Sequence, residues 1–346
     1  MYVFRIHIRP QGGSADMETT FNYCLKEGIL GVGWRTPSNR NTRNWNEYYE
    51  EASQEYDNLQ VCKYIQKWVS PGDLVWTRDP SGHYYLGRVT SGWEYWTTEE
   101  SKRLDIDIAN IFRCELKRVD IDEVPGKIVA CFRATRTIQE VADDKASEYS
   151  RYLWNTLSRQ EAYQIDKTKY ADIFMMLDDE ETEDLVFLYL QSKGWYVVPH
   201  SRKGDSMTFE YLCVNPLNGQ IAVTQVKTGN TTLNRDDYSQ FQQKVFLFQA
   251  NDLYLGVGTN NVESITRNEL IEFLNKAAPW LPKSFRRKME ITNMVSSTIA
   301  QQGAPPDARN DGARRLASHY LSLKWKRCQA PFSICYFVAV IPTGLL

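Results

Sequence analysis

The sequence lacks long apolar runs and any cysteine pairing pattern, and each absence excludes a class of protein. No window approaches the roughly 20 apolar residues that span a bilayer, and the opening MYVFRIHIRPQGG has no apolar signal core. The seven cysteines stand apart without a CxxC pair or metal-finger spacing, and their odd number argues against a secreted disulfide framework. We therefore expect a soluble, cytoplasmic protein that does not associate with a membrane.

An excess of charge of one sign and a nucleotide-binding loop are also absent. The 41 Lys and Arg residues nearly balance the 43 Asp and Glu residues, so any nucleic-acid partner must bind local basic patches. Without a GxxxxGK[ST] loop, we expect no NTP-driven translocation within this chain. The 346 residues favour two domains, and 42% hydrophobic with 24% charged residues is an ordinary globular mixture.

Aromatic residues are abundant, at 13% of the chain with 10 Trp and 20 Tyr, and they crowd into the first hundred residues. The tryptophans there are Trp34, Trp45, Trp68, Trp76, Trp93 and Trp96. Bulky aromatics that fill a small β-barrel core account for most of them, and the others are available to line a stacking pocket.

In several segments of residues 1–135 apolar and polar residues alternate, which indicates a mostly β unit with inserted helices. Residues 46–69 have helical spacing, with Tyr56 on the apolar face. Turns at Pro71-Gly72-Asp73 and Pro80-Ser81-Gly82 frame a β-hairpin. Strands are expected at 2–10, 74–79, 84–89, 113–119 and 126–134. Residues 136–180 are charged and helical in pattern, which is typical of a connector between domains.

Residues 181–300 have the pattern of an α/β domain with a mixed sheet flanked by helices. A helix that stops at Gly194 precedes the β-run WYVV. The remaining elements are expected as strands at 208–214 and 221–229, a helix at 236–249, a strand at 252–259 and a helix at 267–278. Residues 301–346 form a tail of uncertain structure, to which we assign no function.

An acid and a lysine lie on the two strands of the predicted hairpin 208–229. Glu210 is on the first strand, and Gln225 and Lys227 are on the second, where alternate residues share a face. Metal-dependent hydrolysis of a phosphodiester needs oxygen ligands for a hard cation, and a cationic group near the attacking water. A solvated hairpin that carries an acid and a lysine by chance is the alternative.

This pattern resembles the PD-(D/E)XK nuclease superfamily, and within it the Mrr-like restriction endonucleases, over residues 180–260. In that family a helix bearing a Glu leads to a Gly-aromatic pair and a strand, and then come an acid on one strand and acid-x-Lys or Gln-x-Lys on the next. Here Glu183 begins EDLVFLYLQSKGW, Glu210 holds the acid position, and QVK is the triplet. The resemblance implies a restriction-endonuclease-like fold in which Glu183, Glu210 and Gln225 bind Mg²⁺, with Mn²⁺ as a substitute, and Lys227 positions the nucleophilic water.

Two positions depart from the family pattern. Glu210 replaces the usual Asp, which moves the carboxylate outward by one methylene, and Gln225 replaces an acid with a neutral amide, a weaker ligand for a hard cation. Gln240, on the expected helix 236–249, is assigned a supporting role.

The single residues around this motif also have simpler interpretations. Glu183 alone is a common helix-start acid, and Lys227 alone is a common exposed lysine. His200 and the run Ser201–Gly204 could contact phosphate, or could be ordinary loop residues.

The amino-terminal region resembles the PUA-like barrels that include the EVE and YTH domains. The similarity is carried over residues 1–135 by GILGVGW and PGDLVWTRDPSGHYYLGRV. Such domains hold a modified base, extruded from its strand, between aromatic walls. Trp34 matches the wall position, and Trp76 and Trp93 are further candidates for the pocket that could equally be core. Phosphate contacts could come from the basic residues after Trp34, which are Arg35, Arg40 and Arg43.

Together these features predict an Mg²⁺-dependent DNA endonuclease that restricts phage or foreign DNA carrying a modified base. Two alternatives remain open, a non-cleaving reader of modified nucleic acid with a degenerate nuclease fold, and a nuclease directed at RNA. The sequence leaves open which base is modified and whether the protein forms a homodimer.

Overall fold

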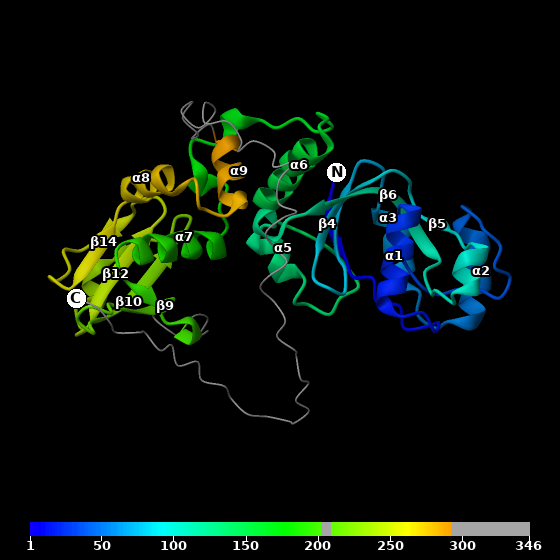
Figure 1. Ribbon diagram of the computed structural model, residues 1–346, viewed down its shortest axis with the longest axis horizontal. Coiled ribbons are helices and arrows are strands. Elements are labelled where there is room, and N and C mark those ends of the chain that lie inside the picture. The colour runs from blue at the N-terminus through cyan, green and yellow to red at the C-terminus, as the bar shows by residue number, and fades with distance from the viewer. Residues whose placement is uncertain (202–208, 293–346) are drawn as a thin grey trace, which may run out of the picture. The chain divides into compact units, whose positions relative to one another are not determined.

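The amino-terminal sheet is mixed and curls into a half-barrel (Figure 1). A computed structural model describes residues 1–201 and 209–292. The strand order is β2-β6-β4-β3-β1-β7, with β5 paired to β6, and only β1 and β3 run parallel within it. The strands are β1 Val3–Ile6, β2 Ile29–Val32, β3 Leu74–Arg78, β4 Tyr84–Val89, β5 Glu94–Tyr95, β6 Asn110–Val119 and β7 Ile138–Glu140. The β3–β4 hairpin was predicted and is confirmed.

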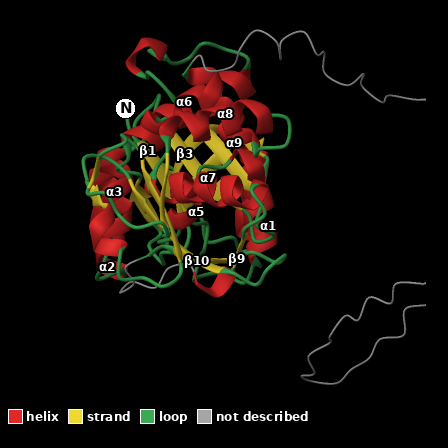
Figure 2. Ribbon diagram, turned by 90° about the vertical axis from the view of Figure 1, so that its left-hand side faces the viewer, coloured by secondary structure: helices red, strands yellow, loops and turns green. Residues whose placement is uncertain are grey.

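Four helices of the described chain belong to this region, and Figure 2 shows α3 beside β1 and β3, where Tyr64 packs edge-on against Phe4. The four helices are α1 Met17–Glu27, α2 Trp45–Glu55, α3 Gln60–Trp68 and α4 Glu99–Arg103. Asp16 caps α1 by accepting the N–H of Thr19, and Gly28 ends it in the left-handed conformation with φ 63°. The single helix expected over 46–69 is broken, because Tyr56 has extended backbone and Asn58 Oδ1 accepts the N–H of Gln60 at 2.9 Å.

Residues 121–178 add a second core to the same sheet. Its further elements are η1 Ile121–Glu123, α5 Gly126–Cys131, α6 Asp144–Ser158, η2 Lys167–Lys169 and η3 Ile173–Met175. The strand predicted at 126–134 is wrong, since α5 begins there after Pro125 and buries Ile128 and Phe132, which are spaced as i and i+4. Tyr149, Leu153 and Trp154 of α6 pack in this core with Trp76 of β3.

The carboxy-terminal sheet has the order β14-β12-β10-β9-β8, with β10, β12 and β14 parallel and β8, β9 and β10 antiparallel. Its strands are β8 Tyr196–Val197, β9 Tyr211–Val214, β10 Ile221–Lys227, β12 Lys244–Gln249 and β14 Val262–Ile265, and the shorter elements are η4 Pro199–Ser201, β11 Leu233–Asn234, η5 Arg235–Tyr238 and β13 Tyr254–Leu255. The helices are α7 Asp179–Ser192, α8 Arg267–Ala277 and α9 Lys283–Ile291. Leu185 of α7 and Leu270 of α8 share a core with Val226 of β10, so these helices cover one face.

The helix predicted over 236–249 is wrong, because this segment contains η5 and then strand β12. The residues Val245–Gln249 are all buried in β12, which lies between the parallel strands β10 and β14. A continuous apolar run such as VFLF suits a strand that is covered on both faces. Gln240 therefore stands in a turn and not on a helix.

Within residues 1–201 and 209–292, no helix combines the length and the apolar character that membrane crossing requires.

Candidate active site and base-binding cavity

The amino-terminal region contains a cavity of about 470 Å³ between the two ends of its curled sheet. His7 and residues 9–12, which follow β1, line one side, and Gly31 to Arg35, at the end of β2, line the other. Thr137, beside β7, also lines it, so residues next to both ends of the strand order meet here. A bridge between Gly13 and Ile106 ties the segment after β1 to the segment before β6. The cavity is thus a product of the sheet's curvature.

Trp34 lines this cavity in an unusual backbone conformation, with φ 60°. A left-handed conformation at a bulky residue costs roughly 1–3 kcal/mol and persists where its surroundings hold it. Here the hydroxyl of Tyr48 donates to the carbonyl of Trp34 at 3.1 Å, and Nδ2 of the buried Asn110 donates to the carbonyl of Gly33 at 2.7 Å. These bonds fix the turn after β2 and with it the position of the indole.

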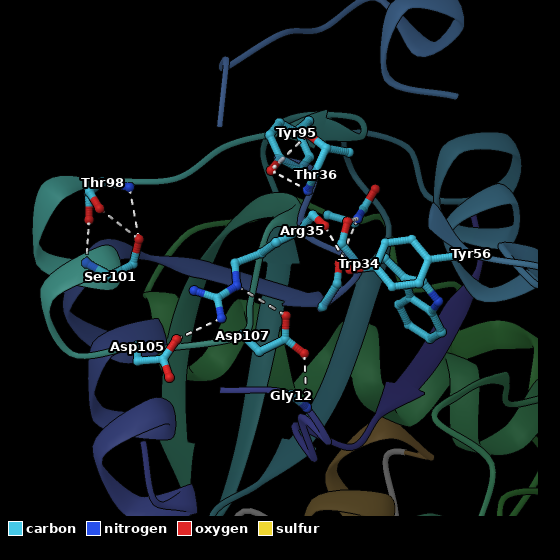
Figure 3. Close-up of polar contacts among 12 residues, drawn as sticks. Gly12, Trp34, Arg35, Thr36, Tyr56, Tyr95, Thr98, Ser101, Asp105 and Asp107 are labelled. Carbon is cyan, nitrogen blue, oxygen red and sulfur yellow. Dashed lines mark hydrogen bonds and ion pairs between the residues drawn. The ribbon is translucent and has the colours of Figure 1, made fainter. Parts of the chain in front are cut away.

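Tyr56 is the second aromatic residue of the lining. Its hydroxyl donates to the carbonyl of Arg35 at 2.7 Å, which holds it beside the Trp34 turn (Figure 3). The sequence pattern placed Tyr56 on the apolar face of a longer helix. The break between α2 and α3 frees it from that face, and the turn-forming pair Asp57-Asn58 was the available signal.

Asp107 supplies a carboxylate to the lining, and two glycines make room for it. A Cβ on Gly33 would lie 2.2 Å from Oδ2 of Asp107, and one on Gly12 would lie 2.7 Å from it. The N–H of Gly12 donates to Oδ2 at 3.2 Å, and Nε of Arg35 lies 3.5 Å from Oδ1. Burial raises the pKa of Asp107, and Arg35 opposes that shift. Figure 3 shows Arg35 between Asp105 and Asp107.

His7 adds a neutral imidazole to the cavity lining. It is 4% exposed, and burial together with the charges of Arg5 and Arg9 lowers its pKa to about 4. Its Nε2 is buried and has no hydrogen-bond partner among the described residues. A buried polar atom without a partner is uncommon in a folded protein and indicates a place for a ligand or water.

Trp76 and Trp93, the other candidates for the pocket, lie in the core. Trp76 is 0% exposed and donates Nε1–H to Oγ of Ser150 on α6 at 3.0 Å. Trp93 packs edge-on against Trp45 and donates Nε1–H to Oδ1 of Asn110 at 3.0 Å. Neither lines the cavity, although Trp93 supports it indirectly, since Asn110 holds the Gly33–Trp34 turn.

The three arginines after Trp34 differ in the charge that they can offer to a phosphate. Arg35 is paired with both Asp105, at 2.7 Å, and Asp107, so carboxylates compensate its charge. Arg43 is paired with Glu94 at 3.2 Å but remains largely exposed. Arg40 is exposed in the same loop. Arg9 is exposed at the cavity and was not singled out by the sequence.

Glu210, Gln225 and Lys227 form a row on the face of the carboxy-terminal sheet away from α7. The β9–β10 register pairs Tyr211 with Thr224, and the N–H of Glu210 continues it to the carbonyl of Thr224 at 2.8 Å. Nε2 of Gln225 and Nζ of Lys227 both reach Oε1 of Glu210, at 2.8 and 3.0 Å. The predicted hairpin therefore brings these three side chains together.

Gln225 is the buried member of this row, at 3% exposure. Its amide oxygen Oε1 has no hydrogen-bond partner among the described residues, while its nitrogen is bonded to Glu210. In residues 1–201 and 209–292, no group of three or more His, Cys, Asp or Glu side chains is placed to hold a metal ion. Mg²⁺ is often bound by one or two protein oxygens, with waters and substrate phosphates as the other ligands. The carboxylate of Glu210 and the unpartnered oxygen of Gln225 fit that donor set.

Glu183 does not stand in this row. It lies half-buried on α7, and its backbone carbonyl accepts a hydrogen bond from the Tyr211 hydroxyl at 3.5 Å. Because α7 packs with Val226, it covers the sheet face opposite Gln225 and Lys227. The acid at the start of α7 that contacts the strand end is Asp179, which accepts a hydrogen bond from Thr228 Oγ1. The position of Asp179 at the first turn of a helix was its only signal in the sequence.

The remaining candidates flank the row or fall outside the described residues. His200 is exposed in η4, and the hydroxyl of Ser201 accepts the N–H of Leu212 at 2.8 Å, a structural contact. Arg202, Lys203 and Gly204 lie outside the described residues, as does the tail from 301 onward. Gln249 of β12, which the sequence did not indicate, donates to the carbonyl of Gly229 at 2.9 Å and so holds the turn after Lys227.

In comparisons with known proteins, the chain matches no protein-family model and no curated protein.

Proposed function

We propose that the protein is a metal-dependent endonuclease that cuts DNA carrying a modified base. The observation that carries this proposal is the row of Glu210, Gln225 and Lys227, in which the buried amide oxygen of Gln225 has no hydrogen-bond partner among the described residues. An acid and an amide oxygen can together hold a hard cation, and the ammonium group beside them can orient a water for metal-assisted phosphodiester hydrolysis.

Each member of the row has a role in this reaction. Glu210 and Gln225 would hold Mg²⁺, which when bound supplies positive charge to the phosphoryl oxygens. Lys227 Nζ, 3.0 Å from Oε1 of Glu210, donates a hydrogen bond to the attacking water and orients it. Glu210 keeps the ammonium group of Lys227 in place before substrate binds.

The cavity supports the modified-base part of the proposal. Its volume of about 470 Å³ lies within the range of small-molecule sites, and a single nucleobase fits it. Trp34 and Tyr56 offer aromatic faces, on which any base can stack once it is extruded from the duplex. The exposed Arg9 is available to contact the flanking phosphates.

The test compares wild-type protein with Lys227→Ala in Mg²⁺ or Mn²⁺, on plain DNA, methylated or hydroxymethylated DNA, and RNA. We expect Lys227→Ala to reduce the cleavage rate by about 100-fold or more, the usual cost of removing one well-placed hydrogen-bond donor from a catalytic site. Lys244→Ala is the matched control, because it breaks a Lys–Glu pair with Glu263 on the same sheet, outside the row. Cleavage that survives Lys227→Ala would contradict the assignment, and equal cutting of plain and modified DNA would contradict the reader role.

A second candidate is a reader that binds modified nucleic acid without cutting it. It is favoured by the single carboxylate of the row, which is already paired with Lys227. A preparation that binds modified DNA but leaves it intact in both metals would establish this candidate over the nuclease.

A further inference from the structure

We propose that Asp107 and His7 read the edge of the bound base, and that the cavity selects bases with an exocyclic amine over thymine and uracil. This inference rests on the base-binding part of the proposed function and not on the nuclease row. It identifies which chemical class of base the cavity accepts.

The carboxylate of Asp107 can bind only a ligand group that donates a hydrogen bond. An ionised carboxylate only accepts, and its two oxygens have room for about four hydrogen bonds. The described contacts are the N–H of Gly12 on Oδ2 and the more distant Nε of Arg35 near Oδ1. Acceptor capacity therefore remains on a carboxylate that lines the cavity.

Asp107 cannot easily move away from the ligand, because the backbone encloses it. The carboxylate lies against Gly33 and Gly12, where any Cβ would come within 2.2 and 2.7 Å of Oδ2. Arg35, held in turn by Asp105 at 2.7 Å, closes the remaining side. A rigid acceptor discriminates strongly, since a ligand without a matching donor leaves a buried charge partly unpaired.

His7 complements Asp107 with a second acceptor. The ring is neutral near pH 7, and a neutral imidazole carries one donor and one acceptor nitrogen. The backbone of Ala134 takes the hydrogen bond of the donor nitrogen, so the unpartnered Nε2 is left as the acceptor. The exocyclic amine of cytosine or adenine is a donor, and its N–H groups can be accepted by Asp107 and His7.

Thymine and uracil fit this lining poorly. Their donor N–H stands between two carbonyl oxygens, which approach the carboxylate of Asp107 with like partial charge. The aromatic faces of Trp34 and Tyr56 stack on every base and do not compensate for this difference. Discrimination therefore depends on the two polar groups.

The experiment measures binding by fluorescence anisotropy without divalent metal. The probes are labelled 12-nucleotide thymidine strands with a single central 5-methylcytosine, N6-methyladenine or thymine, and one with 5-methyl-2-pyrimidinone, which lacks only the amine. We expect the two amine-bearing strands to bind at least about tenfold more tightly than the other two, the discrimination typical of one well-placed polar contact. Equal binding of all four strands to the wild-type protein overturns the proposal without any mutation.

Two substitutions assign the effect to residues. Asp107→Asn should bring the ratio between the 5-methylcytosine and 5-methyl-2-pyrimidinone strands close to one, and His7→Gln should lower it by a smaller factor. Glu115→Gln is the matched control, since it removes a carboxylate that is paired with Lys117 on β6 of the same sheet and does not line the cavity. Thermal unfolding checks that each variant is folded, and the pyrimidinone comparison still decides the question if Asp107→Asn is not. An equal loss in Glu115→Gln and Asp107→Asn overturns the assignment.

The outcome is separable from that of the nuclease proposal. Amine selectivity without cleavage in Mg²⁺ or Mn²⁺ contradicts the nuclease and leaves this inference standing. Cleavage of modified DNA without amine selectivity contradicts this inference and leaves the nuclease standing.

Discussion

The cavity of the amino-terminal region and the row of the carboxy-terminal region are built in different ways. The row of Glu210, Gln225 and Lys227 needs only two regular strands, whose alternation puts the three side chains on one face. The cavity needs exceptions to regular structure, among them Trp34 at φ 60° and Gly33 against a carboxylate. A site of the first kind depends on its side chains, and a site of the second kind depends on its backbone. The following predictions separate the two.

The largest effect is expected from Gly33→Ala, which places a side chain where the backbone of the cavity lies against Asp107. The added Cβ would lie 2.2 Å from Oδ2 of Asp107, so the turn or the carboxylate must shift. We expect a loss of about 1–3 kcal/mol in the free energy of unfolding, measured by urea denaturation, together with loss of base binding. Gly92→Ala is the control, because nothing lies within 4 Å of its Cβ position. If the two variants are equally stable, the backbone at Gly33 does not pack tightly against the carboxylate of Asp107.

Gln225→Glu tests the row through its chemistry. A second carboxylate would be buried beside Glu210, so without metal we expect the free energy of unfolding to fall by about 1–2 kcal/mol. Added Mg²⁺ should restore more stability to this variant than to the wild type, because carboxylates bind Mg²⁺ better than amides do. The melting temperature with and without Mg²⁺ is the measurement, and the exposed Gln220→Glu is the control. If Mg²⁺ has the same effect on both variants, the row does not bind the metal.

Tyr56→Phe removes one hydroxyl from the cavity wall and leaves the ring. Its bond to the carbonyl of Arg35, at 2.7 Å, should be worth about 0.5–1.5 kcal/mol of stability. Base binding should weaken severalfold as the ring loses its fixed position. Tyr2→Phe, at an exposed tyrosine, serves as the control. Unchanged binding would mean that packing alone holds the ring of Tyr56.

The smallest effect at neutral pH is expected from His7. Its pKa in the folded protein is lowered from the ordinary 6.5 to about 4, so the unfolded chain binds a proton more readily in this interval. The stability that neutral His7 contributes is therefore complete above pH 6.5 and is lost as the pH falls toward 4. Urea denaturation across this range should show a shallower decline for His7→Gln than for the wild type. The exposed His83→Gln should follow the wild type, and a parallel decline of all three would contradict the shift.

The contrast between the two sites also explains which elements of the fold and which site residues could be predicted from the sequence. The β3–β4 hairpin and the pairing of Glu210 with Gln225 followed from alternation and turn residues, which are local signals. The helix expected over 236–249 was wrong. Strand β12 is buried there between two parallel strands, and this setting overrides the helical spacing of the sequence.

Residues of the cavity were harder to find. Asp107 and His7 come from segments 100 residues apart, and only the curvature of the sheet brings them to one cavity. Trp34 was found because it closes a glycine-rich strand end, whereas Trp93 also follows a glycine and, like Trp76 in the middle of β3, lies in the core. Aromatic composition alone does not distinguish these roles.

Asn110 holds the aromatic wall of the cavity in place but does not line the cavity itself. Its amide joins the Trp93 indole, the Tyr48 hydroxyl and the Gly33 carbonyl, at 3.0, 2.9 and 2.7 Å, and none of these contacts involves the edge of a ligand. The scaffold that holds the aromatic wall can thus stay constant while positions 7 and 107 vary. Under the proposed function, a new base preference would therefore need very few substitutions, because the residues that hold the aromatic wall are not those that would meet the ligand.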